Sequence, residues 1–443
     1  MRHVGVLESN TSGSGFEGLR AAKELGCRVT FFTSGMERYL AVPGGARYFE
    51  DFVDEIVLCR TNALEELRES VHEVHRRLPF DGFFSFAEYE VVDAALIAEE
   101  LDLPTSPATA VAAARNKILM RRRCAEAGVP MPAFRAVSTP QEARDAVRAV
   151  GLPCVVKPAD ETASAEVLRC DDEDAAVEHV RAVLARRWNV RGQLRHPQVL
   201  VEECVTGVEV SVELLAAGDD VQVLGVTDKS VGGANRFVEL GHLFPSLLPD
   251  AVRRACEETA VAAVRALGLT LGLLHVEVKW TDRGPRLIEV NPRPAGDRIT
   301  DLVDLGLGGS CLTLAVRQYL GETPDPGRIG PPLRGAAIRY LTAPAGRVTG
   351  VGGLAAARRL NGVLAAVVAV GPGDDVAPLA RNEDRVGYVL AVAETSYLAH
   401  RVAEAAAHQI TVAVDTAVEA GATARLAPLV PSQVPAQDQE VAS

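Results

Sequence analysis

Residues 275–293 read HVEVKWTDRGPRLIEVNPR, and this stretch predicts a β-hairpin that carries acidic side chains on one face. Apolar and polar residues alternate on both sides of a Gly/Pro turn, as they do in two half-buried antiparallel strands. Side chains two positions apart share a face of a strand, so His275 and Glu277 point the same way, as do Glu289 and Asn291. Antiparallel pairing is therefore expected to bring Glu277 next to Glu289.

This polar face has the composition of a metal site. Two carboxylates and an amide oxygen on one face are costly unless a cation neutralises them. Hard oxygen ligands, completed by phosphate and water, suit Mg²⁺ bound to a nucleotide. Glu277, Glu289 and Asn291 are our candidate metal ligands, for Mg²⁺ or alternatively Mn²⁺. Taken alone, the hairpin is also compatible with a solvated polar face.

The composition of the whole chain limits the classes of partner that we expect. The chain has 443 residues and a net charge of −13, with no block of lysine and arginine. Nucleic acid and anionic membranes are disfavoured because their phosphates require a basic face, so small-molecule substrates are expected. The eight cysteines form no C-x-x-C pair, which favours a reducing cytoplasm over a disulfide framework or a zinc site. No apolar stretch suits a signal segment or a bilayer span.

The N-terminal part of the chain, residues 1–108, alternates strands and helices. This order predicts an open parallel sheet with helices on both faces. The expected strands are 3–8, 28–33, 56–59 and 82–85, and the expected helices are 16–25 and 63–77.

Two further units and a tail are expected after residue 108. Residues 109–205 predict a linker helix and a small α+β unit, with helices at 110–127 and 174–187 and strands at 154–157 and 198–203. Residues 206–428 predict a larger domain with an antiparallel sheet, built from strands at 209–216, 222–227, 274–280 and 286–290, one helix at 251–267, and a further α+β segment at 334–413. The tail at 429–443 is rich in Pro, Gln and Ser and is expected to be disordered.

Four further motifs place charged side chains on a helix or at the ends of strands. They are Asn116-Lys117, the strand Val155-Val156-Lys157-Pro158, the segment VEECVTGVE at 201–209, and Lys229 with the segment FVELGHLFPS at 237–246. In this order, and followed by the hairpin and Asn291-Pro292-Arg293, they resemble the ATP-grasp superfamily.

The resemblance is greatest to carboxylate–amine ligases such as the L-amino-acid (dipeptide) ligases, and it covers roughly residues 110–413. It implies an ATP-grasp fold: a preceding parallel-sheet domain, a small lid domain and a larger antiparallel-sheet domain. It also implies ATP and Mg²⁺ as cofactors and an ADP-forming carbon–nitrogen ligase, which converts a carboxylate to an acyl phosphate that an amine attacks. A homodimer is suggested by the same resemblance.

The resemblance assigns roles to the nucleotide-binding residues. Lysines at 117, 157 and 229 would reach nucleotide phosphates, where mobile point charges are useful. Glu202, Glu203 and the backbone near Val205 would form a hinge that meets the adenine edge, and Glu209 would accept from the ribose hydroxyls. A solvated turn is the alternative for the Glu-Glu pair.

The resemblance also assigns residues to the substrates. Glu239 and His242 would lie near the amine and the phosphate, and a carboxylate there can hold an ammonium group or accept its proton. Arg293 would face the acyl phosphate and the tetrahedral intermediate, for which a guanidinium fork is suited. Gly296 would allow close backbone approach.

One segment departs from the family pattern. The lid loop, residues 159–167, reads ADETASAEV and has no glycine, although glycine is common at the positions of Glu161, Ala163 and Glu166. We expect a stiffer loop, with two acids in an unfavourable place beside a triphosphate. Ser164 could still donate to phosphate. This departure makes a nucleotide-binding protein with weakened catalysis an alternative function.

Two N-terminal features leave other interpretations open. Gly13, Gly15 and Gly18 spell G-x-G-x-x-G, which would suggest an NAD-dependent oxidoreductase, but residues 9–12 separate the first glycine from the strand. A loop at 9–14 that lines the substrate pocket and includes Ser9, or a purely structural loop, is the better interpretation. Glu88 follows the fourth strand, at the end where open α/β sheets bind ligands, and is a further substrate-site candidate. An ATP-grasp enzyme with bicarbonate or a purine intermediate as acceptor is the remaining alternative.

Overall fold

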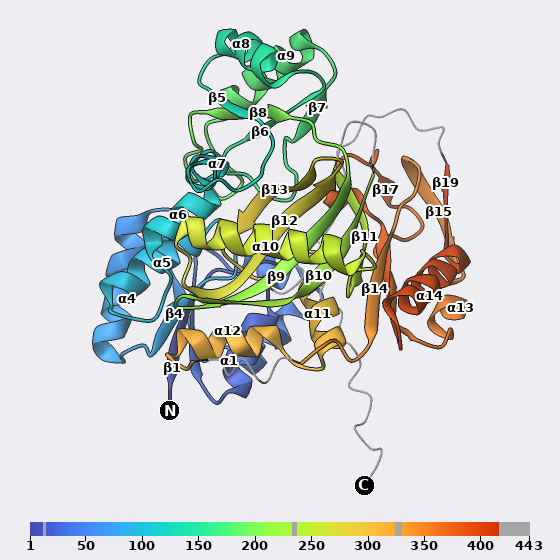
Figure 1. Cartoon of the computed structure of the whole chain (residues 1–443). Helices are drawn as coiled ribbons and strands as arrows, with labels where there is room; N and C mark the ends of the chain where they lie inside the picture. Colours follow the sequence, from blue (N-terminus) through green and yellow to red (C-terminus); the bar gives the residue numbers. More distant parts are fainter. Residues whose placement is uncertain (12–14, 233–236, 324–329, 416–443) are drawn as a thin grey trace.

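The computed structural model describes residues 1–11, 15–232, 237–323 and 330–415 of the chain (Figure 1). The tail expected at 429–443 lies outside the described residues. The structure has three bodies: a parallel-sheet domain, a small lid subdomain and a large antiparallel sheet with a C-terminal extension (Figure 1).

The N-terminal domain is the expected open parallel sheet, with strand order β3-β2-β1-β4. Val6 and Phe31 pack on one face with Leu19, whereas Leu7 and Phe32 pack on the other with a different set of helices. Continuous apolar strands therefore follow from burial on both faces. The strands are β1 (His3–Leu7), β2 (Arg28–Thr33), β3 (Glu55–Leu58) and β4 (Gly82–Phe84), and the helices are α1 (Glu17–Glu24), α2 (Glu37–Leu40), α3 (Gly45–Phe52), α4 (Leu64–Arg77) and α5 (Val91–Glu100).

The helix expected at 110–127 is wrong as a single element, because the chain breaks it at Asn116. The backbone of Asn116 is extended (φ −98°, ψ 108°), and its side chain accepts from the N–H groups of Ile118 and Leu119. This is an N-cap, which asparagine favours. The two helices are α6 (Ala108–Arg115) and α7 (Lys117–Glu126), so Lys117 begins a helix beside the cavity.

The lid subdomain is a four-stranded antiparallel sheet covered by two helices (Figure 1). The first of these helices begins with Thr139 as N-cap and Pro140 in the first turn, a combination that fixes its start. The elements are β5 (Phe134–Val137), α8 (Pro140–Val150), β6 (Cys154–Pro158), β7 (Leu168–Cys170), α9 (Glu173–Ala185) and β8 (Val199–Glu203), in strand order β5-β8-β6-β7.

The large sheet has eight strands in the order β13-β12-β9-β10-β11-β14-β18-β16, with antiparallel pairing throughout. Helix α10 covers one face, where Ala260 and Val264 pack on Val212 and Val276. Two helices not expected from the sequence, α11 and α12, lie on the other face (Figure 1). The elements are β9 (Val208–Ala217), β10 (Asp220–Gly232), β11 (Val238–Phe244), α10 (Asp250–Leu267), β12 (Leu271–Thr281), β13 (Gly284–Asn291), α11 (Ile299–Leu307), α12 (Cys311–Tyr319), β14 (Gly335–Leu341), β16 (Val363–Val368) and β18 (Gly387–Ala393).

The C-terminal segment completes this sheet and adds a small sheet of its own. Strands β14, β18 and β16 extend the large sheet, and a three-stranded sheet with order β17-β15-β19 lies beside them. The remaining elements are β15 (Gly346–Gly352), α13 (Leu354–Arg358), β17 (Asp375–Val376), α14 (Ser396–Gln409) and β19 (Thr411–Asp415).

Within the described residues, no single helix has both the length and the apolar composition to cross a membrane. The pair α11 and α12 meets that test together, with a bend of 100° between them.

Candidate active site

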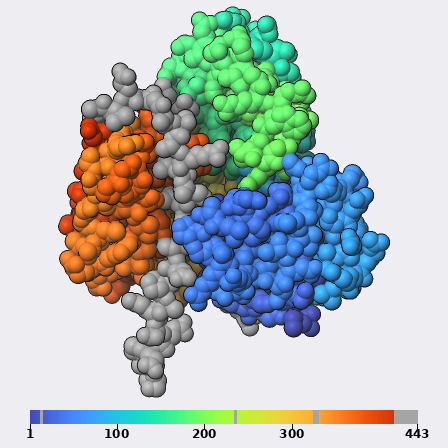
Figure 2. Space-filling model, turned by 180° about the vertical axis from the view of Figure 1, so that it is seen from behind, coloured from blue at the N-terminus to red at the C-terminus, as the bar shows by residue number. Residues whose placement is uncertain are grey.

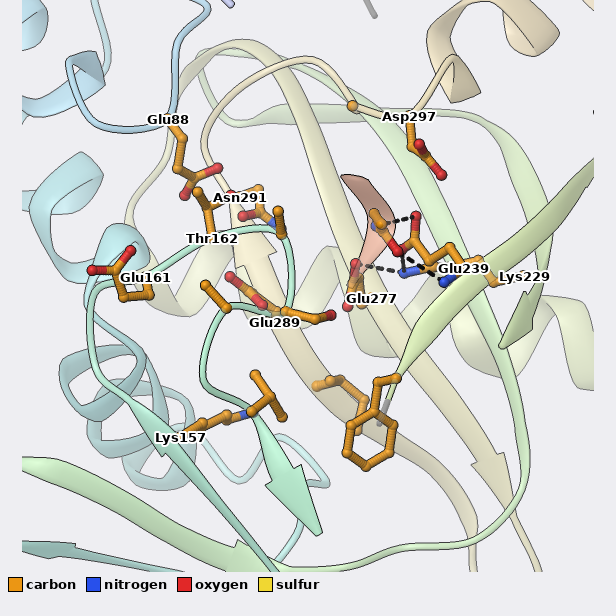
Figure 3. Close-up of a pocket in the computed structure, with 18 of the residues that line it drawn as sticks. Glu88, Lys157, Glu161, Thr162, Lys229, Glu239, Glu277, Glu289, Asn291 and Asp297 are labelled. Atoms are coloured by element: carbon orange, nitrogen blue, oxygen red, sulfur yellow. Dashed lines mark hydrogen bonds and ion pairs between the residues drawn. The ribbon is translucent and has the colours of Figure 1, made fainter. Parts of the chain in front are cut away.

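One cavity of about 500 Å³ collects nearly all of the candidate residues. It is bounded by the N-terminal domain, the lid subdomain and the large sheet (Figure 3). The candidates that line it are Glu88, Lys117, Lys157, Ser164, Glu202, Glu203, Val205, Glu209, Lys229, Glu239, Glu277, Glu289, Asn291, Arg293 and Gly296.

The hairpin of β12 and β13 has the expected register. Glu277 pairs with Glu289, and His275 pairs with Asn291, with a bulge just after Glu277. Figure 3 shows Glu277, Glu289 and Asn291 together at the floor of the cavity. Two carboxylates and an amide oxygen are therefore available to one divalent ion, which is the donor set that Mg²⁺ prefers.

Lysine side chains neutralise these carboxylates. Lys229 Nζ lies 2.6 Å from Glu277, 2.9 Å from Glu239 and 3.1 Å from Glu209. Burial alone would raise the pKa of Glu277, but Lys229 holds it well below its usual range. Lys117 Nζ lies 2.8 Å from Glu289. Each hairpin carboxylate thus has a lysine partner.

The position of Lys229 differs from the expected one. The strand expected at 222–227 continues to Gly232, so Lys229 lies inside β10 and pairs with His242 of β11. The lysine is only 7% exposed. Its three carboxylate neighbours outweigh the effect of burial and raise its pKa well above the usual value. A charged ammonium group is consequently fixed beside the hairpin.

Lys157 and Glu202 form a second buried network beneath the lid. Lys157 Nζ lies 2.5 Å from one oxygen of Glu202, and Arg121 lies 2.9 Å from the other. Burial lowers the pKa of Lys157 despite this partner. Both Glu202 oxygens have cationic partners, so the Glu202 side chain holds Lys157 in place.

Two backbone N–H groups of the hinge after β8 make hydrogen bonds within the protein. The N–H of Val205 donates to the carbonyl of Glu203 at 3.1 Å, and the N–H of Cys204 donates to the carbonyl of Pro153 at 3.2 Å. These two N–H groups are therefore paired within the protein. Glu209 lies 3.3 Å from Lys279 in addition to Lys229. The adenine and ribose roles stay predictions.

Arg293 makes a buried ion pair with Glu88. Arg115 lies on the other side of the same carboxylate at 3.3 Å. Burial would raise the pKa of Glu88, but Arg293, Arg115 and Lys117 lower it to about 2. Glu88 is therefore an ionised anchor that holds Arg293 against the N-terminal domain.

Glu239 and His242 belong to a network whose other members come from distant parts of the chain. His242 lies 3.3 Å from Glu239 and 2.8 Å from Asp297, and Arg385 donates to Asp297 at 2.8 Å. Arg385 also lies 3.6 Å above the Tyr340 ring. Burial lowers the pKa of His242, but the two carboxylates outweigh it and raise that pKa.

The structure does not place three of the residues discussed above in the cavity. Ser9 does not line the cavity in the described structure; its N–H donates to Tyr39, and Asn10 and Thr11 form the wall instead. His242 is 3% exposed, and it does not line the cavity as Glu239 does. Gly13 lies outside the described residues.

The sequence did not single out several cavity residues, which come from the N-terminal domain, the lid, the segment after β13 and the C-terminal strands. Local patterns offered no signal for them, because their partners are far away in the chain: Arg385 is separated from Asp297 by 88 positions. The residues missed are Tyr89, Arg191, Asp297, Arg298, Tyr340, Asn382, Arg385 and Tyr388.

The lid loop adopts a backbone that glycine would favour. Ala163, Ser164 and Glu166 have φ values of 53°, 55° and 57°. The two acids are not left beside the phosphate site without partners, as had been expected: Arg195 lies 3.2 Å from Glu161 and 2.6 Å from Glu166. The loop backbone is therefore strained, and ion pairs with Arg195 hold its two acids in place.

Replacing Ala163 with glycine is expected to raise the thermal midpoint, because a left-handed alanine costs about 1 kcal/mol. Differential scanning fluorimetry measures the change. Ala165, a neighbour without a positive φ, is the matched control. Ala165→Gly should lower the midpoint, since glycine there only adds freedom to the unfolded chain. Equal shifts in both variants would contradict the strain.

A buried acid behind the cavity gives a prediction for pH. Glu90 is 2% exposed, and burial together with Glu8 raises its pKa to about 8. Between its ordinary value of 4.5 and about 8, the folded protein keeps a proton that the unfolded chain has released, so stability falls as pH rises. Glu90→Gln has no such proton and should lose less stability than the wild type between those limits.

Thermal midpoints of both proteins across this range test that expectation. Glu69→Gln, at an exposed position on α4, is the control and should follow the wild type at every pH. Parallel curves for wild type and Glu90→Gln would contradict the assignment.

Three segments of the chain match domains of known protein families. Residues 19–105 match the ATP-grasp N-terminal domain, residues 150–301 match the ATP-grasp domain, and residues 339–415 match the L-amino acid ligase C-terminal domain 2. The chain belongs to the ATP-grasp family. This membership confirms the expected fold and agrees with the expected enzyme class, an ADP-forming carbon–nitrogen ligase.

Individual relatives agree with this membership. An uncharacterized protein of Sinorhizobium fredii is 30% identical over 360 residues, which cover 80% of this chain and 73% of that protein. Carnosine synthase 1 of Mus musculus is 30% identical over 256 residues, which cover 54% of this chain but only 30% of the synthase. The crystal structure of L-amino acid ligase from Bacillus licheniformis has the same fold, with a TM-score of 0.78, 22% identity, and coverage of 94% of this chain and 99% of that one. The homodimer and the cytoplasmic location stay predictions.

Proposed function

We propose that the protein is an ATP-dependent ligase that joins a carboxylate to an amine through an acyl phosphate. The observation that carries this proposal is the hairpin: Glu277 and Glu289 are register partners that line a cavity together with four lysines and Arg293. Family membership supports ATP as the nucleotide. Amino acids or amino-acid conjugates are the proposed substrates, in keeping with the matched L-amino acid ligase domain.

The donor set fits a divalent ion bound with a nucleotide. Glu277, Glu289 and Asn291 would hold Mg²⁺ or Mn²⁺, and their oxygens are the hard ligands such ions require. A bound ion would offset negative charge during phosphoryl transfer. Lys117, Lys157 and Lys229 line the same cavity and would reach the phosphates.

The proposed reaction has two balanced steps. A carboxylate oxygen attacks the γ-phosphorus of ATP, the bond to the β-phosphate oxygen breaks, and ADP leaves. An amine nitrogen then attacks the acyl carbon, inorganic phosphate leaves, and one proton is lost from nitrogen. Arg293 would stabilise the charged intermediate, and Glu239 would hold the ammonium group and accept its proton.

The test is release of ADP and phosphate against a matrix of carboxylates and amines, with product masses recorded. We expect stoichiometric ADP and phosphate, and an amide product, for at least one pair of substrates. ADP release that depends on bicarbonate or on a purine intermediate would replace the proposed acceptor class.

A nucleotide-binding protein with weakened catalysis is a second candidate. The left-handed, glycine-free backbone of the lid loop favours it. Mg-ATP binding by calorimetry without turnover over the same matrix would support this candidate against the ligase.

A further inference from the structure

A loop of the lid subdomain brings one arginine to the boundary between two cavities. Arg191 lies between α9 and β8 and lines both the main cavity and a side cavity of about 280 Å³. Asn62 of the N-terminal domain donates to the carbonyl of Arg191 at 3.1 Å, and Gln193 donates to the carbonyl of Tyr89 at 3.1 Å. Figure 2 shows this contact between the lid, in green, and the N-terminal domain, in blue. The loop backbone thus holds Arg191 at the cavity wall.

Arg191 differs from the other arginines of the main cavity. Among the cavity arginines in the described part of the chain, Arg293 pairs with Glu88, Arg298 with Asp301 at 2.7 Å, and Arg385 with Asp297 at 2.8 Å. The carboxylate nearest to Arg191 is Glu90, at 3.6 Å, which is too far for a hydrogen bond. The Nε atom of Arg191 is buried and has no hydrogen-bond partner among the described residues.

Among the described residues, no carboxylate accepts a hydrogen bond from the side chain of Arg191. One oxygen of Glu90 has no hydrogen-bond partner among these residues, and burial together with Glu8 raises the pKa of this acid to about 8. Glu8 is taken by Arg38 at 2.7 Å and by surrounding hydroxyl groups. Glu161 is taken by Arg195 and by the Tyr89 hydroxyl at 2.7 Å. Arg191 therefore has one carboxylate within 4 Å, that of Glu90, and its Nε group makes no hydrogen bond with it.

Two successive residues of the cavity lining, Glu88 and Tyr89, contact Arg293 and Arg191 respectively. Glu88 binds Arg293, and the next residue, Tyr89, lies with its ring 6.0 Å from the guanidinium of Arg191. One substrate lying along this wall would meet Arg293 at its reacting end and Arg191 at its far end. A planar guanidinium binds a carboxylate through two parallel hydrogen bonds.

We propose that Arg191 binds a second carboxylate of the acid substrate, so that the ligase selects dicarboxylic acids or acidic amino acids over their neutral analogues. This proposal rests on the proposed ligase function for the position of the reacting carboxylate. The second carboxylate of the substrate would supply the hydrogen bond that Glu90, at 3.6 Å, does not make with Arg191.

Calorimetry tests the proposal without requiring turnover. The protein, with Mg²⁺ and a non-hydrolysable ATP analogue, is titrated with matched pairs: glutamate against glutamine, aspartate against asparagine, and succinate against succinamate. We expect the diacid of at least one pair to bind more tightly than its amide. In Arg191→Gln the diacid should lose about 10- to 100-fold in affinity, as expected for a charged hydrogen bond, whereas the amide should be unchanged.

Two controls separate this site from its surroundings. Arg187→Gln removes an exposed arginine from the same loop and should leave the preference for diacids intact. Arg191→Lys keeps the charge and should restore part of the preference, with a thermal midpoint that shows the fold is kept. In an active enzyme, the Arg191→Gln effect should appear in KM and not in kcat.

The outcomes are distinguishable from failure of the ligase function. A diacid preference that Arg191→Gln removes supports the site even where no substrate pair yields ADP. Equal binding of acid and amide by the wild type in every pair, or equal losses for both in the variant, would overturn it. Weaker binding of the ATP analogue by Arg191→Gln would assign the guanidinium to the nucleotide and likewise overturn it.

Discussion

Glu289→Gln is expected to lower substrate-dependent ADP formation by about 10²- to 10³-fold. The carboxylate of Glu289 faces its register partner Glu277 across the hairpin, and the substitution keeps the shape of the side chain while removing one charged oxygen ligand. Charge stabilisation by a bound metal contributes several kcal/mol to a transition state, and each 1.4 kcal/mol is about a tenfold change in rate. The measurement is ADP release at saturating substrates over a series of Mg²⁺ concentrations.

A second readout does not depend on turnover. Mg-ATP should raise the thermal midpoint of the wild type, through binding to the folded state, and should raise that of Glu289→Gln less. Asp282→Asn is the matched control, because it removes an exposed carboxylate from the turn of the same hairpin. An unchanged rate in Glu289→Gln would remove the metal assignment.

Arg121→Met is expected to lower the free energy of unfolding by about 3–5 kcal/mol, the usual cost of leaving one member of a buried ion pair alone. Arg121 is fully buried and links three elements: it binds Glu202 of β8 and donates to the carbonyls of Leu287, at 2.7 Å, and Ile288, at 3.0 Å, in β13. Methionine fills a similar volume but donates to none of these oxygens. Glu202 would then keep only Lys157 as a cationic partner.

Urea unfolding followed by circular dichroism measures this loss. Arg122→Met is the matched control, because Arg122 is the next residue of α7 and is exposed. Its effect should stay within about 0.5 kcal/mol, as for ordinary surface substitutions. An Arg121→Met protein as stable as Arg122→Met would show that the buried network is not a source of stability.

The sequence predicted the elements whose signals are local. The alternation from His275 to Asn291 determined both the hairpin and the pairing of Glu277 with Glu289. Lys157 was found because a lysine that ends an apolar strand before proline is conspicuous. The parallel sheet followed from the order of strands and helices.

What the sequence did not reveal depends on long-range pairing or on a single backbone angle. The break at Asn116 was missed because helical residues flank it on both sides, and only the cap hydrogen bonds mark the boundary. The acids of the lid loop looked unfavourable because Arg195, which binds both, lies 29 positions beyond Glu166. Asp297 and Arg385 meet only when β11, β14 and the C-terminal strands have assembled.

The lysines of the hairpin network have a thermodynamic consequence. Lys229 contacts one oxygen of Glu277 and Lys117 contacts one oxygen of Glu289, so a divalent ion bound to these carboxylates would lie beside two ammonium groups that repel it. Nucleotide phosphates are anions that attract both the ion and the ammonium groups. Each ligand therefore offsets charge that opposes binding of the other, and metal and nucleotide should bind with positive, reciprocal coupling.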